Sequence, residues 1–297
     1  MKVHRSPSLL TRAVVGAAAA SLLLAACGSD SEEPSGESGS DVGADESLAD
    51  LVPQEIRDKG TLVIGTDASY APNEFFDEDG ETIVGMDVDL FDAVAAKLGL
   101  ETEWQNAAFD TIIVGVTGGK YDVGVSSFTI NEERKQQVNM ISYFNAGTQW
   151  AAQSGNPDDV DPNNPCGLTV AVQTGTVQEE VDLPARQEQC GDNPMNILSF
   201  EGQDEATTAL VTGRAQAMLA DSPVVAYAVE QAGGAIEAVG EIYDAAPYGY
   251  VVAKDQTELA EAIVAALEAL AEDGTYEQIL DEWGNTAGAI DDFAVNP

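Results

Sequence analysis

Short apolar runs alternate with amphipathic stretches along most of the chain. Residues 61–65 are apolar and β-branched, which is typical of a buried strand. Between residues 87 and 98 the apolar positions fall on one helical face, and Gly99 follows as a stop signal. A strand, a helix and a third strand are predicted next, over residues 101–105, 111–117 and 123–125. This β-α-β-α-β order predicts a sheet with helices on its faces.

The same alternation repeats in the second half of the chain. Strands are predicted over residues 168–173, 196–200 and 217–220, and helices over residues 175–189, 203–211 and from Pro223 onward. Proline is well tolerated at a helix start, which supports the last of these helices. Two similar α/β units in succession predict two lobes.

The last predicted elements return to the first lobe. A strand is expected over residues 248–253, followed by helices over residues 258–271 and 276–283. These elements have no sheet of their own, so we expect them to complete the first one. Two segments would then cross between the lobes, near residues 144–149 and 246–249.

The N-terminus has the features of a secretory signal peptide. Basic residues precede an apolar run over residues 13–26, which is shorter than the roughly 20 residues that a membrane span needs. The sequence Leu-Ala-Ala-Cys-Gly over residues 24–28 resembles the lipobox of bacterial lipoproteins. That resemblance implies cleavage before Cys27 and a lipid on Cys27. An ordinary signal peptide with an incidental cysteine is the alternative.

A polar segment separates this leader from the predicted lobes. Residues 28–47 are mostly glycine, serine, aspartate, glutamate and proline, and such a stretch cannot bury enough apolar surface to offset its chain entropy. It therefore predicts a flexible tether. The expected organisation is a signal peptide (1–26), a lipidated cysteine with its tether (27–55), a first lobe (56–146 and 248–297) and a second lobe (147–247).

The charge of the chain excludes several classes of function. The formal net charge is −40, which argues against nucleic acid and against docking on an anionic membrane surface. The one histidine, His4, lies in the leader, so the mature protein lacks histidine-based triads and histidine-rich metal sites. We expect neither a metal nor a cofactor.

Two cysteines remain beyond Cys27, at positions 166 and 190. In an exported protein, an even pair is most simply a disulfide. A bridge between Cys166 and Cys190 would close a loop of about 25 residues, which is worth about 3 kcal/mol on the chain-entropy model.

Candidate ligand-binding residues follow the predicted strands. Open α/β sheets bind ligands at the carboxyl ends of their strands. The candidates are Asp67, Tyr70, Phe109, Ser126, Ser127, Thr129, Arg134, Thr176 and Asp221. They include a guanidinium, two carboxylates, two aromatic rings, several hydroxyls and a predicted helix start. An α-amino acid presents a carboxylate, an ammonium and a side chain, which this set matches.

Arg134 is the strongest single candidate. It follows a run of hydroxyl residues over 126–129, where a new helix is expected to begin. Its planar fork can bond both oxygens of a carboxylate, and Ser127 and Thr129 could add weaker donors. An ordinary surface arginine near a helix start is the alternative.

The ordered set of motifs resembles a known family. They are Gly-Thr-Asp-Ala-Ser-Tyr-Ala-Pro (65–72), Gly-Met-Asp-Val-Asp-Leu (85–90), Gly-Lys-Tyr-Asp-Val (119–123), Thr-Ile-Asn-Glu-Glu-Arg (129–134), Gly-Thr (175–176), Gly-Arg-Ala-Gln-Ala (213–217), Ala-Asp-Ser-Pro (220–223) and Gly-Thr-Tyr (274–276). From about residue 60 to residue 283, the chain resembles the amino-acid-binding solute receptors of bacterial ABC importers, extracellular solute-binding protein family 3. The resemblance implies an α/β, two-lobed periplasmic-binding-protein-like fold of type II.

The resemblance also implies which residues bind the main-chain groups of the ligand. Arg134 falls on the residue that clamps the carboxylate, and Thr176 with its neighbour falls on the helix start that adds donors. Asp221 falls on the acid that binds the ammonium, helped by Thr129 and by the main chain at Ser127.

Three further residues are implied at the ligand side chain. Tyr70 and Phe109 fall on the aromatic residues that pack against it, and Asp67 falls on the residue facing its polar end. The chain departs from the family pattern at Val177 and Asn73, and over residues 140–144, where an acid before the hinge is missing.

Several of these acids and aromatic residues have structural alternatives. Asp67 could cap a turn, and Tyr70 and Phe109 could be ordinary core residues. Asp87 and Asp89 look like a catalytic pair, but their positions favour a helix cap and a surface acid. Asp122 directly precedes the strand predicted over residues 123–125, and we expect it to stabilise the start of that strand.

We therefore expect a monomeric, lipid-tethered receptor on the outer face of the cell membrane. It would capture an amino acid and deliver it to the permease subunits of an ABC importer. Asp67 disfavours acidic ligands through charge repulsion, so glutamine, arginine and lysine are the candidates. The alternatives are the binding module of a sensory system, or an exported dehydratase on the same fold. The dehydratase is disfavoured because the sequence offers no histidine and no well-supported acid–base pair.

Overall fold

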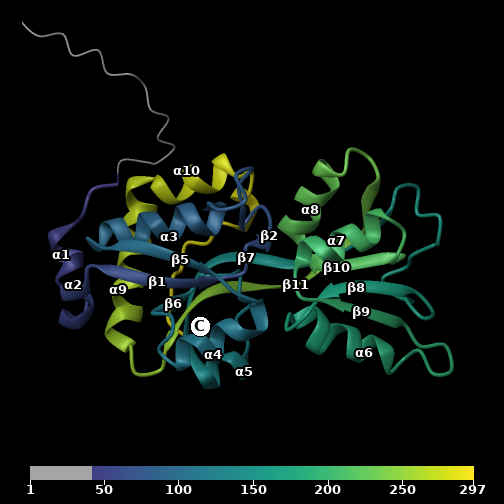
Figure 1. Cartoon of the computed structure of the whole chain (residues 1–297), viewed down its shortest axis with the longest axis horizontal. Coiled ribbons are helices and arrows are strands. Elements are labelled where there is room, and N and C mark those ends of the chain that lie inside the picture. The colour runs from purple at the N-terminus through teal and green to yellow at the C-terminus, as the bar shows by residue number, and fades with distance from the viewer. Residues whose placement is uncertain (1–41) are drawn as a thin grey trace, which may run out of the picture. The chain divides into compact units, whose positions relative to one another are not determined.

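The described residues, 42–297, contain one eight-stranded mixed sheet in the computed structural model (Figure 1). Its strand order is β5-β1-β6-β11-β7-β10-β8-β9. The strands are β1 (Thr61–Thr66), β5 (Glu101–Asn106), β6 (Val123–Gly124), β7 (Val138–Gln153), β8 (Thr169–Gln173), β9 (Asn196–Phe200), β10 (Ala217–Asp221) and β11 (Ile236–Ala253). The expected signal peptide, the lipidation at Cys27 and the tether as far as residue 41 lie outside the described residues.

Two long strands connect the two ends of this sheet. β7 and β11 pair antiparallel along their whole length, from Val138 opposite Ala253 to Gln153 opposite Ile236. At one end, β6 pairs with β11, and β1 and β5 follow in parallel, which forms the first lobe. At the other end, β10 pairs with β7, and β8 and β9 follow in parallel, which forms the second lobe. The predicted crossing segments lie in the middle of β7 and β11.

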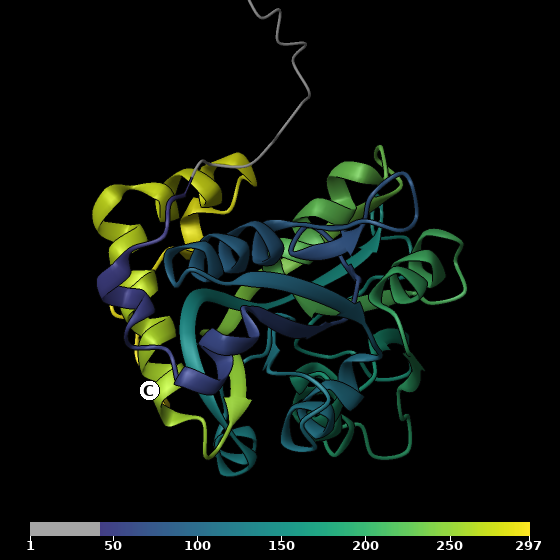
Figure 2. The ribbon, with the colours of Figure 1, turned by 60° about the vertical axis from the view of Figure 1, so that its left-hand side comes forward.

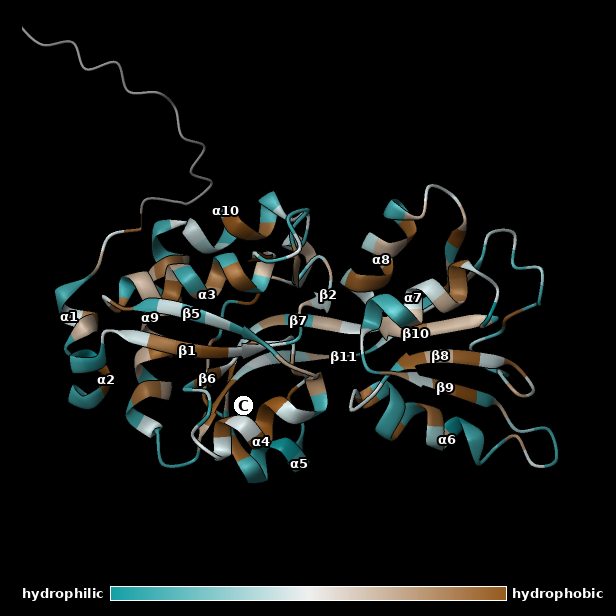
Figure 3. Cartoon of the chain, in the orientation of Figure 1, coloured by the Kyte–Doolittle hydropathy of each residue, from teal (hydrophilic) through white to brown (hydrophobic). Residues whose placement is uncertain are grey.

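Helices cover both faces of each lobe. In the first lobe, α3 (Met86–Lys97), α9 (Thr257–Asp273) and α10 (Thr275–Glu282) enclose one apolar cluster, and α4 (Phe109–Thr117) covers another. α5 (Glu132–Gln137) leads into β7. In the second lobe, α7 (Gln203–Val211) and α8 (Ser222–Gln231) lie over one face, and the π-helix η1 (Gln178–Asp182) and α6 (Leu183–Gln187) over the other. Figure 3 shows hydrophobic colour along β8 and β1 and hydrophilic colour on the outer loops.

Regular structure begins before residue 55, the expected end of the tether. Two short helices, α1 (Glu46–Ala49) and α2 (Gln54–Lys59), lie near α9 in Figure 2. Asp45 caps α1 by accepting a hydrogen bond from the Ser47 amide at 2.8 Å. Val52 is only 2 % exposed, and Leu48 packs against the same core. A few apolar residues spaced within a polar stretch are therefore enough to hold this segment on the first lobe.

Three other features differ from the predicted pattern. A small sheet of β2 (Ser69–Tyr70), β3 (Glu74–Phe76) and β4 (Ile83–Val84) was not predicted, because such short strands have no readable alternation. The helix predicted over residues 175–189 begins instead at Gln178 and consists of η1 and α6. β11 starts twelve residues before Tyr248, where the strand was predicted to begin, because its first part is largely exposed and its apolar and charged residues do not alternate regularly. A short 3-10 helix, η2 (Thr286–Gly288), follows α10.

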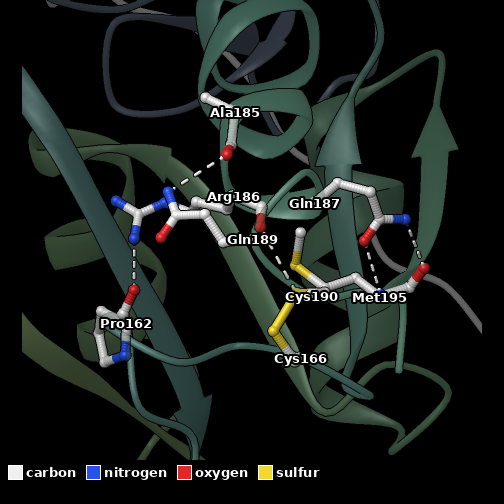
Figure 4. The surroundings of a disulfide bond; sticks show 8 residues. All are labelled: Pro162, Cys166, Ala185, Arg186, Gln187, Gln189, Cys190 and Met195. Carbon is white, nitrogen blue, oxygen red and sulfur yellow. Dashed lines mark hydrogen bonds between the residues drawn. A yellow bond between two sulfur atoms is a disulfide. The ribbon is translucent and has the colours of Figure 1, made fainter. Parts of the chain in front are cut away.

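The predicted disulfide is present. Cys166 and Cys190 are bridged, with 5.2 Å between their Cα atoms, and the bond joins the segment before β8 to the end of α6 (Figure 4). Nearby, Arg186 donates to the Pro162 carbonyl, and the Gln187 side chain bonds the main chain of Met195 at 2.7 and 3.0 Å. The bridge therefore fastens one edge of the second lobe.

Replacing Cys166 and Cys190 together by serine should lower the free energy of unfolding by about 3 kcal/mol, because the bridge closes a loop with a sequence separation of 24 residues. Urea unfolding of the oxidised wild type and of the double variant measures this difference. A thiol reductant should bring the wild type down to the variant and leave the variant unchanged. Equal midpoints for the oxidised wild type and the variant would contradict the expectation.

Candidate functional site

Arg134 is buried near the junction of the two lobes. It lies in the first turn of α5, where Asn131 caps the helix by accepting a hydrogen bond from the Arg134 amide at 2.8 Å. The side chain is 6 % exposed, and its guanidinium donates to the Thr129 carbonyl at 2.9 Å and to the Gly175 carbonyl at 3.0 Å. Because Gly175 belongs to the second lobe, Arg134 links the two lobes through a neutral acceptor.

Two aromatic rings surround the same guanidinium. Phe109 and Phe128 stack at 4.7 Å, and the guanidinium carbon of Arg134 lies 5.4 and 5.6 Å from their centroids. Burial lowers the pKa of Arg134, although the charges of Glu180 and Asp221 oppose this. None of the salt bridges in residues 42–297 involves Arg134. It is thus a buried cation that an oxyanion could neutralise.

Asp221 is a buried carboxylate held by neutral donors. It ends β10 and precedes α8, and it is 5 % exposed. One oxygen accepts from the hydroxyls of Tyr70 and Tyr248, both at 2.8 Å, and the other from the Gln178 amide at 2.7 Å. Burial raises the pKa of Asp221, and these three donors partly offset that rise. Tyr70 reaches it from the first lobe, so this contact also joins the lobes.

Asp67 is a second carboxylate of this kind. It follows β1 and is 6 % exposed. It accepts hydrogen bonds from the Ser69 hydroxyl (2.7 Å), the Phe109 amide (2.9 Å) and the Gln173 side chain (3.0 Å). Burial raises the pKa of Asp67 to about 6. Gln173 ends β8 in the second lobe, so Asp67 is a third point of contact between the lobes.

The hydroxyl candidates fall into two groups. Thr176 donates to the Gln173 carbonyl at 2.8 Å, and the Thr129 carbonyl accepts from Arg134, so both lie next to the charged residues. Ser126 accepts from the Asp67 amide at 3.1 Å and donates to Glu74 at 3.0 Å.

Ser127 lies deeper in the first lobe. Its backbone has φ of 51°, in the left-handed region, and its amide donates to Asp87 at 3.1 Å. Its hydroxyl accepts from the Asn73 side chain at 2.9 Å. The structure therefore places Ser127 against interior carboxyl groups of the first lobe.

The expectation for Asp87 and Asp89 was wrong. Gly85 is the N-cap of α3, and Asp87 is fully buried, where it accepts from Ser127 and from the Tyr143 hydroxyl. Asp89 accepts from the Trp283 indole at 2.8 Å, and burial raises its pKa. Asp122 does support the start of a strand, because it accepts from the Val63 amide of β1 at 2.7 Å.

Sequence reasoning missed five residues of this region. They are Glu74, Phe128, Gln173, Gln178 and Tyr248. Glutamine, tyrosine and phenylalanine are also common as ordinary core or surface residues, so neither their type nor their position gave a distinct signal. Gln173, Gln178 and Tyr248 are recognised only through the acids that they bond, and Phe128 only through its place beside Arg134.

The buried charges of the site do not form ion pairs. Arg134, Asp67 and Asp221 are all absent from the five salt bridges of the described chain. Each is bonded to neutral groups of the protein, and each takes part in a contact between the lobes. Buried charges are normally paired, so this arrangement suits a ligand that carries the opposite charges.

Comparisons with known proteins agree with such a site. The family model of bacterial extracellular solute-binding proteins, family 3, matches residues 62–286. The arginine-binding protein ArgT of Corynebacterium glutamicum is 38 % identical over 301 residues, which cover 100 % of this chain and 98 % of the relative. The ABC transporter glutamine-binding protein GlnH of Bacillus subtilis is 29 % identical, covering 88 % of this chain and 92 % of the relative.

Two solved structures are similar as well. An ancestral arginine-binding protein bound to arginine has a TM-score of 0.71 and 37 % identity, covering 75 % of this chain and 98 % of that one. An ancestral amino acid-binding protein, a precursor of cyclohexadienyl dehydratase, has a TM-score of 0.70 and 33 % identity, covering 80 % and 99 %.

These findings define an amino-acid receptor with the two-lobed type II fold, which confirms the predicted fold class. The chain belongs to the bacterial extracellular solute-binding proteins, family 3. It is an extracytoplasmic amino-acid-binding protein that delivers its ligand to an ABC transporter. Its curated relatives are solute-binding proteins rather than enzymes. Within residues 42–297, none of the helices is both long and apolar enough to span a bilayer.

Asp67→Asn should stabilise the ligand-free protein at pH 7. Burial raises the pKa of Asp67 to about 6, so the folded protein binds a proton that the unfolded chain releases, and stability falls as pH rises from about 4 to 6. The asparagine removes this penalty, which we expect to raise the free energy of unfolding by about 1–3 kcal/mol at pH 7. Chemical denaturation at pH 7 and pH 4 measures it, and a gain that is equal at both values would contradict the explanation.

Proposed function

We propose that the protein binds a basic amino acid, arginine above all others. The observation that carries this proposal is the set of buried charges without counter-ions: one guanidinium, on Arg134, and two carboxylates, on Asp67 and Asp221. Arginine presents the complementary set of one carboxylate and two cations. Glutamine could donate a hydrogen bond to Asp67, but it would leave that charge uncompensated.

Each group of the ligand then has a partner. The α-carboxylate bonds the Arg134 fork, supported by Thr176 and the amide of Val177, and the α-ammonium bonds Asp221. The distal guanidinium pairs with Asp67. Thr129 and the main chain at Ser127 assist at the ammonium, in keeping with the family pattern.

The aromatic candidates complete the proposed site. Tyr70 and Phe109 would pack against the aliphatic part of the ligand side chain. Ser126 would help to hold Asp67 in place, because its hydroxyl accepts a hydrogen bond from the Asp67 amide at 3.1 Å. The names of two similar proteins, an arginine-binding protein and an arginine-bound ancestral one, support the choice of ligand.

Ligand capture would proceed by closure of the two lobes. The first lobe, residues 56–146 and 248–297, would move against the second, residues 147–247, about the middle of β7 and β11. Contacts such as Tyr70 to Asp221 and Asp67 to Gln173 join the two lobes. A ligand that touches both lobes shifts the population toward the closed form, which the permease subunits would recognise.

The proposed cellular setting follows from the N-terminus. Cleavage after residue 26 and a lipid on Cys27 would anchor a monomeric receptor to the outer face of the cell membrane. The polar segment that follows Cys27 would then let the receptor reach its permease.

Arginine should bind at least about 100-fold more tightly than citrulline, which has nearly the same shape but a neutral side-chain end. Citrulline leaves the buried charge of Asp67 unpaired, a loss of roughly 3–5 kcal/mol. Isothermal titration of protein refolded from denaturant, which removes carried-over ligand, measures both affinities. In Asp67→Asn the two ligands should bind within about tenfold of each other. Equal affinities of the wild type for arginine and citrulline would show that Asp67 does not pair with the ligand side chain.

Arg134→Ala should abolish tight binding of every amino acid tested, because it leaves the ligand carboxylate buried without a partner. The expected loss is roughly 3–5 kcal/mol of binding free energy. Lys135→Ala is the matched control, since Lys135 pairs with Glu132 at the surface of the same helix, and it should bind normally. Binding by Arg134→Ala within about threefold of the wild type, less than about 1 kcal/mol, would show that Arg134 is not the clamp.

A further inference from the structure

Two carboxyl groups are buried together beneath the candidate site. Glu74, on β3, and Asp87, on α3, are both fully buried. Glu74 accepts from the hydroxyls of Ser126 and Ser127 at 3.0 and 3.3 Å. Asp87 accepts from the Ser127 amide at 3.1 Å and hydroxyl at 3.2 Å, and from the Tyr143 hydroxyl. Because both carboxyls bond the same Ser127 hydroxyl, they are neighbours.

The backbone keeps these two groups close. The amides of Met86 and Asp87 donate to the carbonyls of Pro72 and Asn73, at 3.0 and 2.9 Å. A Cβ atom on Gly85 would lie 2.1 Å from the Asn73 carbonyl oxygen, so only glycine fits there. The start of α3 is thus held against the segment that carries Glu74, which keeps the two carboxyl groups near each other.

No cation neutralises the pair within residues 42–297. Neither carboxyl takes part in a salt bridge. The titratable groups that face the pair from the surrounding elements are Asp67, Tyr70, Tyr143, Tyr248 and Tyr250, all of them acids. Two carboxylates in such a place would repel each other strongly.

The hydrogen bonds around Glu74 and Asp87 indicate which of the two carboxyl groups carries a proton. The Oδ1 atom of Asp87 is buried and accepts no hydrogen bond from an amide, hydroxyl or amino group of residues 42–297. A protonated Glu74, which shares the Ser127 hydroxyl with Asp87, would supply a donor to this region. Burial, and next the charge of Asp87, raise the pKa of Glu74 well above its ordinary range. Burial raises the pKa of Asp87 only to about 6, because hydrogen bonds from Tyr143 and Ser127, and one from Glu74, oppose the rise. Glu74 is therefore the acid and Asp87 the carboxylate.

We propose that Glu74 and Asp87 hold one shared proton at neutral pH, and that this acid–carboxylate pair positions Asp67 and Tyr70 for the ligand. Ser126 connects the pair to Asp67, because its hydroxyl bonds both Glu74 and the Asp67 amide. Tyr70 is the direct cross-strand partner of Glu74 in the small sheet. The positioning role rests on the proposed function, whereas the shared proton does not.

The shared proton gives the ligand-free protein a measurable pH dependence. The folded protein keeps a proton that Glu74 releases in the unfolded chain, so stability falls as pH rises above about 4.5. Between about pH 6.5 and 7.5, the folding equilibrium constant should fall about tenfold per pH unit because of this group. Glu74→Gln keeps a donor for Asp87, but the glutamine side chain cannot titrate. The dependence of its free energy of unfolding on pH should therefore be weaker than that of the wild type, by the contribution of one proton.

Chemical denaturation across this pH range, without ligand, tests the proton. Glu78→Gln is the matched control, because Glu78 is exposed in the same segment, and it should keep the wild-type slope. Equal slopes for the wild type and Glu74→Gln overturn the shared proton. If Glu74→Gln does not fold, infrared spectroscopy of the wild type at pH 7 decides. The carbonyl band of a buried carboxylic acid, shifted in D₂O, supports the pair, and its absence overturns it.

Arginine binding at pH 7 tests the positioning role separately. Glu74→Gln should bind arginine within about threefold of the wild type, whereas Glu74→Ala, which leaves Asp87 without its donor, should lose at least about tenfold. If alanine and glutamine have the same effect, the positioning role is wrong. If the wild type itself does not bind arginine, the proposed function fails, and the unfolding slopes still decide the proton.

Discussion

The antiparallel pairing of β7 with β11 is the constraint on which the site depends. These strands cross from one lobe to the other, and the remaining strands attach at their two ends. The carboxyl ends of β1 and β6 therefore meet those of β8 and β10. Asp67, Ser126, Gln173 and Asp221 lie at or just beyond these four ends. The register of β11 shifts between Tyr248 and Gly249, where Tyr248 reaches Asp221.

The charges that meet at this junction are bonded but not neutralised. Tyrosine hydroxyls, glutamine amides and a main-chain amide donate hydrogen bonds to Asp67 and Asp221, and a main-chain carbonyl accepts one from Arg134. A lysine or arginine beside Asp221 would stabilise the empty protein, but it would compete with the ammonium of a ligand. Neutral donors hold the carboxylate in place and leave its charge available. The unpaired charges lower the free energy of unfolding at neutral pH, as the raised pKa of Asp67 indicates.

The sequence predicts the parts of this arrangement that periodicity or charge reveals. The apolar strands and most amphipathic helices lie where expected. Arg134 lies in the first turn of a helix and Asp221 at the end of a strand, as the sequence predicts. The first part of β11 was not predicted, because an exposed strand with polar residues has no hydrophobic pattern. Asp87 was misread because an acid in a first helical turn usually caps or faces solvent, and here tertiary packing buries it. Neutral partners such as Gln178 become visible only in three dimensions.

Charge balance connects the site with the carboxyl pair beneath it. Among the described residues, the buried charged side chains are four acids, Asp67, Glu74, Asp87 and Asp221, and one base, Arg134. One proton on Glu74 and a bound basic amino acid would together leave a single net negative charge. That charge belongs to Asp87, which lies in the first turn of α3, where the helix dipole favours an anion, and which accepts bonds from Ser127 and Tyr143. A ligand with a neutral side chain would leave a second negative charge in the same interior, so the carboxyl pair itself favours a cationic ligand.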